Sequence, residues 1–178
     1  MASSVVTNDT TWTTPRTWVS GELVTAVIMN GHVRDNFNAL HVPAGGYSLI
    51  DQTDYATSSA SFTDVDATNL NITFTSGGGD ILVYFSGSIA NSSGVNSTKN
   101  YLNISVDGTD FVADDGIVAM TAITPVIVNA SFSVRLYGLS AASHTIKLRY
   151  KCSAGTMTLY AGSGSAPDIH PPFYAIEV

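Results

Sequence analysis

Hydrophobic and polar positions follow two different patterns along the chain, and the change occurs near residue 42. From about position 25 to position 40 the apolar side chains recur at spacings of four, four and three, on a stripe made of Met29, Val33, Phe37 and Leu40. That spacing places them on one side of an amphipathic helix. Beyond position 46 the pattern becomes alternation, most clearly in Asn69–Thr75, where every second residue is large and apolar. The sequence therefore predicts one helix followed by a β-module.

The β-module is expected to contain many short strands separated by turns. Strand candidates lie at 47–51, 60–66, 69–75, 80–90, 99–106, 109–113, 117–122, 126–137, 143–151, 156–161 and 172–178. Asp107-Gly108 is a hairpin turn signal, because both positions of such a turn need positive φ. About ten strands in roughly 130 residues suit a jelly roll.

We therefore predict a mainly β fold: a jelly-roll-like, tumour-necrosis-factor-like β-sandwich preceded by an extended N-terminal arm and one α-helix. Residues 1–42 are expected to form the docking arm and helix, and residues 43–178 the β-module. The segment His41–Gly46 is the expected linker, since Pro43 stops the helix and two glycines follow it.

The arm and helix leave apolar side chains that they cannot bury themselves. Thr25 is placed to cap the helix, and Asn30-Gly31 interrupts its pattern, which indicates a bend or a close contact. The arm carries both tryptophans of the chain, and a short arm offers them no core. We predict a homotrimer, with a docking or oligomer surface formed by Trp12, Trp18, Met29, Val33, Phe37 and Leu40.

Composition supports an all-β module and excludes several partners. Charged residues make up 12% of the chain, against a usual ~25%. The net charge of −7 argues against nucleic acid, which needs clustered basic residues. The basic residues of the later strands alternate with apolar ones and are expected to face solvent; they are Arg135, Lys147, Arg149 and Lys151. No apolar run approaches the ~18 residues of a membrane span.

The sequence holds no convincing catalytic constellation, so we predict no enzyme activity, no cofactor and no metal. The histidines are scattered over the chain, at positions 32, 41, 144 and 170, and the single Cys152 suits core packing. Aspartates near strand ends are interpreted as solvated turn residues, with Ca²⁺ ligation as the alternative; these pairs are Asp51/Asp54, Asp64/Asp66 and Asp114/Asp115.

One aromatic residue offers a binding alternative. Tyr55 lies in the loop-like stretch 52–61 and is a candidate for stacking on a sugar ring. An exposed aromatic platform, or a carboxylate pair in a groove, would favour a carbohydrate-binding module or a small glycan hydrolase instead of a structural protein.

The opening of the chain also contains a longer motif. It consists of Trp12, Trp18, Gly21, Glu22, Thr25 and Ala26, followed by Met29, Asn30, His32, Arg34, Asp35, Asn36 and Leu40. The motif resembles the N-terminus of small tail, fibre and head-surface proteins of tailed bacteriophages. The resemblance implies a non-enzymatic virion structural protein that is assembled in the host cytoplasm. Its expected partners are copies of itself, other virion proteins and, for an adhesin, a host-surface glycan.

Overall fold

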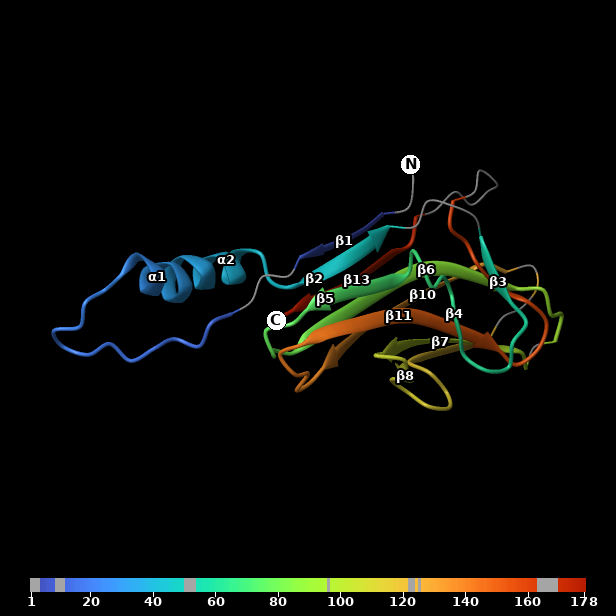
Figure 1. The fold of residues 1–178 in the computed structure, drawn as a ribbon. Coiled ribbons are helices and arrows are strands. Elements are labelled where there is room, and N and C mark those ends of the chain that lie inside the picture. Colours follow the sequence, from blue (N-terminus) through green and yellow to red (C-terminus); the bar gives the residue numbers. More distant parts are fainter. Residues whose placement is uncertain are drawn as a thin grey trace.

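The structure is a computed structural model that describes residues 4–8, 12–49, 54–95, 97–121, 124, 126–162 and 170–178. Two antiparallel sheets pack face to face, and a hairpin made of an extended arm and a helix projects from one end of the sandwich (Figure 1). No helix among the described residues is long and apolar enough to cross a membrane.

The first sheet contains the terminal strands of the chain. Its order is β1-β2-β13-β6, with β10 on the other edge of β6, and the short β12 and β3 continue the sheet along the far half of β6. The strands are β1 Ser4–Asn8, β2 Gly45–Leu49, β13 Pro172–Glu177, β6 Ile81–Asn91, β10 Val128–Leu136, β12 Met157–Leu159 and β3 Tyr55–Thr57.

The second sheet has β11 and β7 at its centre. Both β4 and β5 pair with one edge of β11, while β8 and β9 pair with the outer edge of β7. The strands are β4 Thr63–Asp64, β5 Asn71–Thr75, β11 Ser143–Cys152, β7 Lys99–Val106, β8 Thr109–Asp110 and β9 Val118–Thr121. The strand orders β2-β13-β6-β10 in the first sheet and β5-β11-β7-β9 in the second correspond to two Greek keys, which together form a jelly roll. The predicted β-sandwich is confirmed.

The core lies between the two sheets and follows the predicted alternation. Along β11 every second side chain is buried, from His144 to Cys152. The largest fully buried side chains come from both sheets and include Phe74, Phe85, Phe173, Ile104 and Leu148. Cys152 is 1% exposed, and its thiol lies 3.4 Å from the carbonyl oxygen of Thr57. The interpretation of Cys152 as a core residue is confirmed.

The helix begins where the sequence predicts and changes its winding in the middle. α1 spans Ala26–Met29, a π-helical stretch spans Asn30–Arg34, and α2 spans Asp35–His41. The side chain of Thr25 accepts a hydrogen bond from the amide of Ile28 at 3.4 Å, which confirms the predicted cap. The predicted interruption at Asn30-Gly31 is the start of the π-helical stretch, a feature that often marks functional sites.

The predicted linker is shorter than expected, because Gly45 and Gly46 belong to β2. At Gly45 φ is +152°, and a Cβ there would lie 2.3 Å from the carbonyl oxygen of Ala175 in β13. Glycine is required at this position because the neighbouring strand occupies the space that a side chain needs.

The N-terminal boundary differs from the expectation that residues 1–42 lie outside the β-module. Ser4–Asn8 form β1, which pairs with β2 as the edge strand of the first sheet. The sequence gives little sign of this strand, because five residues without a turn signal do not reveal partners 37 to 45 positions later, from Asn8 with Gly45 to Ser4 with Leu49. The arm and helix are therefore an excursion between two adjacent strands of the jelly roll.

Candidate docking site

The arm runs outward from residue 12, reverses at a tight turn and returns as the helix (Figure 1). The turn is closed by a hydrogen bond of 3.1 Å from the amide of Glu22 to the carbonyl oxygen of Val19. Gly21 has φ +81° there, as the third residue of a type II turn requires. The Gly-Glu pair of the sequence motif thus has a local structural role.

An ion pair stabilises the tip of this hairpin. The guanidinium of Arg16 contacts the carboxylate of Glu22, and the other carboxylate oxygen lies 3.4 Å from the amide of Val19. The same guanidinium lies 5.4 Å from the centre of the Trp18 ring, within the range of a cation–π contact. Trp18 therefore has a defined position even though about half of it is exposed.

A buried amide joins the arm to the helix near the sandwich. Asn36 of α2 is 5% exposed. Its side-chain oxygen accepts a hydrogen bond from the amide of Thr13 at 2.8 Å, and its nitrogen donates to the Thr13 carbonyl oxygen at 2.8 Å. A second bond of 3.3 Å goes to the carbonyl oxygen of His32. One side chain thus satisfies both backbone groups of Thr13 and holds the two limbs of the hairpin together.

Apolar side chains concentrate on this hairpin. Among the described residues, ten of the seventeen exposed large hydrophobic side chains belong to residues 12–42. Phe37 and Leu40 are 67% and 68% exposed, while Trp12, Trp18 and Met29 are a little under half exposed. So many large apolar side chains exposed on one hairpin indicate a surface that binds a partner.

The structure brings together four of the six predicted docking residues. Trp12, Val33, Phe37 and Leu40 line one shallow pocket of about 180 Å³ between the arm and the helix. Trp18 lies at the tip with Arg16, and Met29 ends α1. The residues share one projecting hairpin, and the predicted interface role of all six remains a prediction.

The foot of the hairpin adjoins a glycine-rich loop of the sandwich. A groove of about 470 Å³ separates the end of α2 from residues 77–79, and Trp12 and Leu40 contribute to its wall. Behind this loop the carboxylate of Glu177 accepts hydrogen bonds from the amides of Gly77 and Gly79, at 3.0 and 2.6 Å. At Gly79 a Cβ would lie 2.7 Å from a carboxylate oxygen of Glu177, so glycine allows this close approach.

Tyr55 belongs to β3, a strand that the sequence did not predict, and it is half-buried. Its hydroxyl donates a 2.7 Å hydrogen bond to Asp66. Burial, together with this hydrogen bond and the charge of Asp66, raises the pKa of Tyr55. The hydroxyl is thus engaged inside the chain, and its candidate role in glycan contact stays a prediction.

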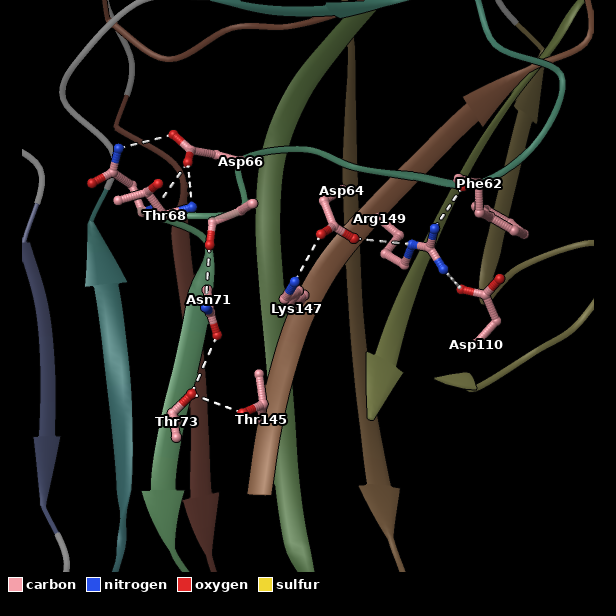
Figure 2. A network of polar contacts seen from close by, with 12 residues as sticks. Phe62, Asp64, Asp66, Thr68, Asn71, Thr73, Asp110, Thr145, Lys147 and Arg149 are labelled. Atoms are coloured by element: carbon pink, nitrogen blue, oxygen red, sulfur yellow. Dashed lines mark hydrogen bonds and ion pairs between the residues drawn. The ribbon is translucent and has the colours of Figure 1, made fainter. Parts of the chain in front are cut away.

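The aspartate pairs have different surroundings. Asp66 accepts from the amides of Thr68 and Asn69, at 2.8 and 2.9 Å, and so caps a turn (Figure 2). Burial alone would raise the pKa of Asp66, but the hydrogen bond from Tyr55 and those from the turn lower it. Asp54 accepts from the amide of Ala161 at 2.9 Å.

The remaining members of these pairs do not form a cluster. Asp114 and Asp115 are exposed, and Asp51 lies outside the described residues. Nowhere in the described ranges do three His, Cys, Asp or Glu side chains gather closely enough to hold a metal ion.

The outer face of the second sheet carries a network of ion pairs. Asp64 lies 2.9 Å from the ammonium of Lys147 and 3.3 Å from Nε of Arg149, and Arg149 also contacts Asp110 at 2.6 Å (Figure 2). Lys151 lies 4.5 Å from the ring centre of Phe62. These basic residues face outward as predicted. Lys147 and Arg149 are paired with carboxylates, whereas Lys151 packs against aromatic rings.

The outer face of the first sheet is different, because a row of three tyrosines crosses it. Tyr47, Tyr174 and Tyr84 are register partners on adjacent strands, and the rings of Tyr84 and Tyr174 stack at 5.0 Å. The next row consists of Ile176, Leu82 and Arg135, and Arg135 is paired with Asp80 at 2.9 Å. Sequence reasoning missed this row, because its members come from three distant segments and only strand register brings them together.

Comparisons with known proteins give no family for this chain. No family model matches it, and no curated protein matches it. Several solved structures match this chain in a structural comparison. Among them is dimeric latent PorU from Porphyromonas gingivalis, with a TM-score of 0.33 and 11% identity. That match covers 72% of this chain but 13% of the PorU chain. A likeness this distant defines neither a family nor a function.

Proposed function

We propose that this protein is a non-enzymatic structural protein of a tailed-bacteriophage virion. In this proposal the hairpin of residues 12–42 docks the protein onto other virion proteins, and the jelly roll is displayed on the surface of the tail, a fibre or the head. The observation that carries the proposal is the concentration of exposed apolar side chains on a hairpin whose two limbs are held together by their own polar contacts. Ordering before binding reduces the conformational entropy that docking would otherwise cost.

The contacts within the hairpin support this role. The Asn36 amide and the Arg16–Glu22 ion pair hold the hairpin's backbone, while the large side chains of Trp18 and Phe37 remain 48% and 67% exposed. Several of the residues that make these contacts belong to the motif that resembles phage virion proteins. The motif thus combines residues that shape the hairpin with residues that remain exposed on it.

We further propose that the protein is a homotrimer whose jelly rolls meet through the outer face of the first sheet. The support is the contrast between the two outer faces. The second sheet presents paired charges such as Asp64 and Lys147, whereas the first presents Tyr47, Tyr174 and Tyr84 in one row. Tyrosine is enriched at protein interfaces, and charged residues are depleted from their centres.

The oligomer is tested by native mass spectrometry and light scattering at micromolar concentration. We expect trimer for the natural chain and monomer for Tyr47→Glu, because the new charge would be buried at the centre of the interface. Tyr101→Glu is the matched control, since Tyr101 lies on the outer face of the other sheet beside Lys151; it should remain trimeric. Monomer from the natural chain would refute the oligomer, and a monomer that also binds glycans would favour the carbohydrate-binding alternative.

The docking role is tested separately by incorporation into particles. Virions assembled with Phe37→Glu should lack the protein, because the substitution places a charge on the exposed apolar stripe. Asn38→Glu introduces the same charge at the neighbouring exposed position and should be incorporated. Equal incorporation of both variants would show that the apolar stripe is not the docking surface.

A further inference from the structure

His144 lies at the end of the sandwich from which the hairpin projects. It is buried near the start of β11. Its Nδ1 lies 2.8 Å from a carboxylate oxygen of Asp107, in the turn after β7, and its Nε2 lies 2.9 Å from the carbonyl oxygen of Ser140, in the loop before β11. The ring therefore bridges two loops that are far apart in the sequence.

The two partners of the ring determine its protonation. A carbonyl oxygen accepts only, and an ionised carboxylate accepts only. A neutral imidazole has one N–H, so in either tautomer one ring nitrogen would face an acceptor with its lone pair. The imidazolium form donates to both partners. We propose that His144 is held doubly protonated and acts as a latch between the two loops, and that its deprotonation weakens the contacts at the foot of the arm hairpin.

The surroundings of the ring favour the charged form. Burial by itself lowers the pKa of His144, but the hydrogen bond to Asp107, the one to Ser140 and the charge of Asp107 together raise it above its ordinary value. Asp107 is the charged group that acts on the ring; the register neighbour on β5 is Phe74, and Ser140 is uncharged. Asp107 is also held by the amide of Thr145 at 2.8 Å.

A continuous set of contacts joins the latch to the foot of the hairpin. Two residues beyond Ser140, the carbonyl oxygen of Ala142 accepts a 2.9 Å hydrogen bond from the amide of Ser76. The hydroxyl of Ser76 lies 3.2 Å from the carboxylate of Glu177, which also holds Gly77 and Gly79. That glycine loop and Trp12 both line the groove at the foot, and a Cβ at Gly77 would lie 3.3 Å from the backbone nitrogen of Trp12.

Nitrogen NMR of the full chain tests the protonation directly. We expect both ring nitrogens of His144 to be protonated at pH 6.5, and one proton to be lost only above the ordinary pKa of about 6.5. In Asp107→Asn this transition should move to lower pH, because the partner charge is gone. A ring that is neutral with a single tautomer at pH 6.5 in the natural chain would overturn the proposal without any variant.

Tryptophan emission tests the link to the hairpin, because both tryptophans of the chain lie on it. In a Trp18→Phe background the emission of Trp12 should change with the same midpoint as the His144 titration, and the change should move with that titration in Asp107→Asn. His41→Gln, which removes an exposed histidine at the end of α2, is the control and should leave the midpoint unchanged. Trp12 emission that does not change through the His144 titration, or whose midpoint changes only in His41→Gln, would overturn the link. The measurement uses the isolated protein and is independent of whether the hairpin docks onto a virion.

Discussion

Replacing Asn36 by alanine should release the arm from the helix while leaving the jelly roll folded. The substitution removes two hydrogen bonds of 2.8 Å to the backbone of Thr13. A hydrogen bond contributes a net of about 0.5–1.5 kcal/mol, so the docked arm should lose roughly 1–3 kcal/mol. Thr13 is exposed, so water can hydrate its backbone groups once the arm has moved. The loss is therefore expected to remain local.

The assay is hydrogen exchange at the Thr13 amide, together with limited proteolysis of residues 12–24. Because each ~1.4 kcal/mol is a factor of ten, exchange should accelerate by roughly five- to 140-fold. Asn38→Ala, two positions along the same helix on an exposed residue, is the matched control and should change neither readout. Equal exchange in both variants would refute the role of the Asn36 amide. Loss of the cooperative melt in Asn36→Ala would instead show that the hairpin is part of the folding core.

Three further predictions concern the β-module. A chain lacking residues 1–41 should still melt cooperatively, but at lower temperature, because β2 loses its partner strand; a chain that aggregates instead would show that β1 is indispensable. In a denaturant titration, Asp66→Asn should lower the free energy of unfolding by about 1–3 kcal/mol, and Asp114→Asn by at most ~0.5 kcal/mol. A chelator should change neither value, and a fall in stability on chelation that Ca²⁺ restores would contradict this. The His144–Asp107 pair should make stability greatest between about pH 4 and 6.5. The pKa of His144 is raised on folding, so its contribution is fully present below the unfolded pKa and is lost as pH rises through the folded pKa; the pKa of Asp107 is lowered, so its contribution is fully present above the unfolded pKa and is lost as pH falls through the folded pKa. A stability–pH profile that is the same in Asp107→Asn would argue against this pair.

Local signals in the sequence predicted much of this structure. The cap at Thr25, the alternation through Asn69–Thr75 and the turn at Asp107-Gly108 each depend on neighbouring residues, and each is confirmed. Both turn residues have positive φ, +50° and +83°, as the hairpin signal requires. The number and spacing of the strands predicted the jelly-roll class, and the strand order comes from the structure.

The features that the sequence did not reveal depend on distant pairing. Thr13 and Asn36 are 23 positions apart, and His144 and Asp107 are 37 apart. In each case one polar side chain finds its partner only after the fold is complete, so neither composition nor periodicity indicates the pair. The short strand β1 was missed for the same reason, because its partner β2 lies beyond the whole arm and helix.

The insertion of the hairpin between β1 and β2 has a mechanical consequence. Both limbs of the hairpin continue into adjacent antiparallel strands, and the hairpin extends along the long direction of the sandwich (Figure 1). A pull on the tip therefore acts along both strands at once. Ladder hydrogen bonds lie perpendicular to the strands, so those between β2 and β13 are strained together in shear instead of opening one after another. A protein tethered by this hairpin would transmit tension into two paired strands at the edge of its first sheet and not through a single flexible linker.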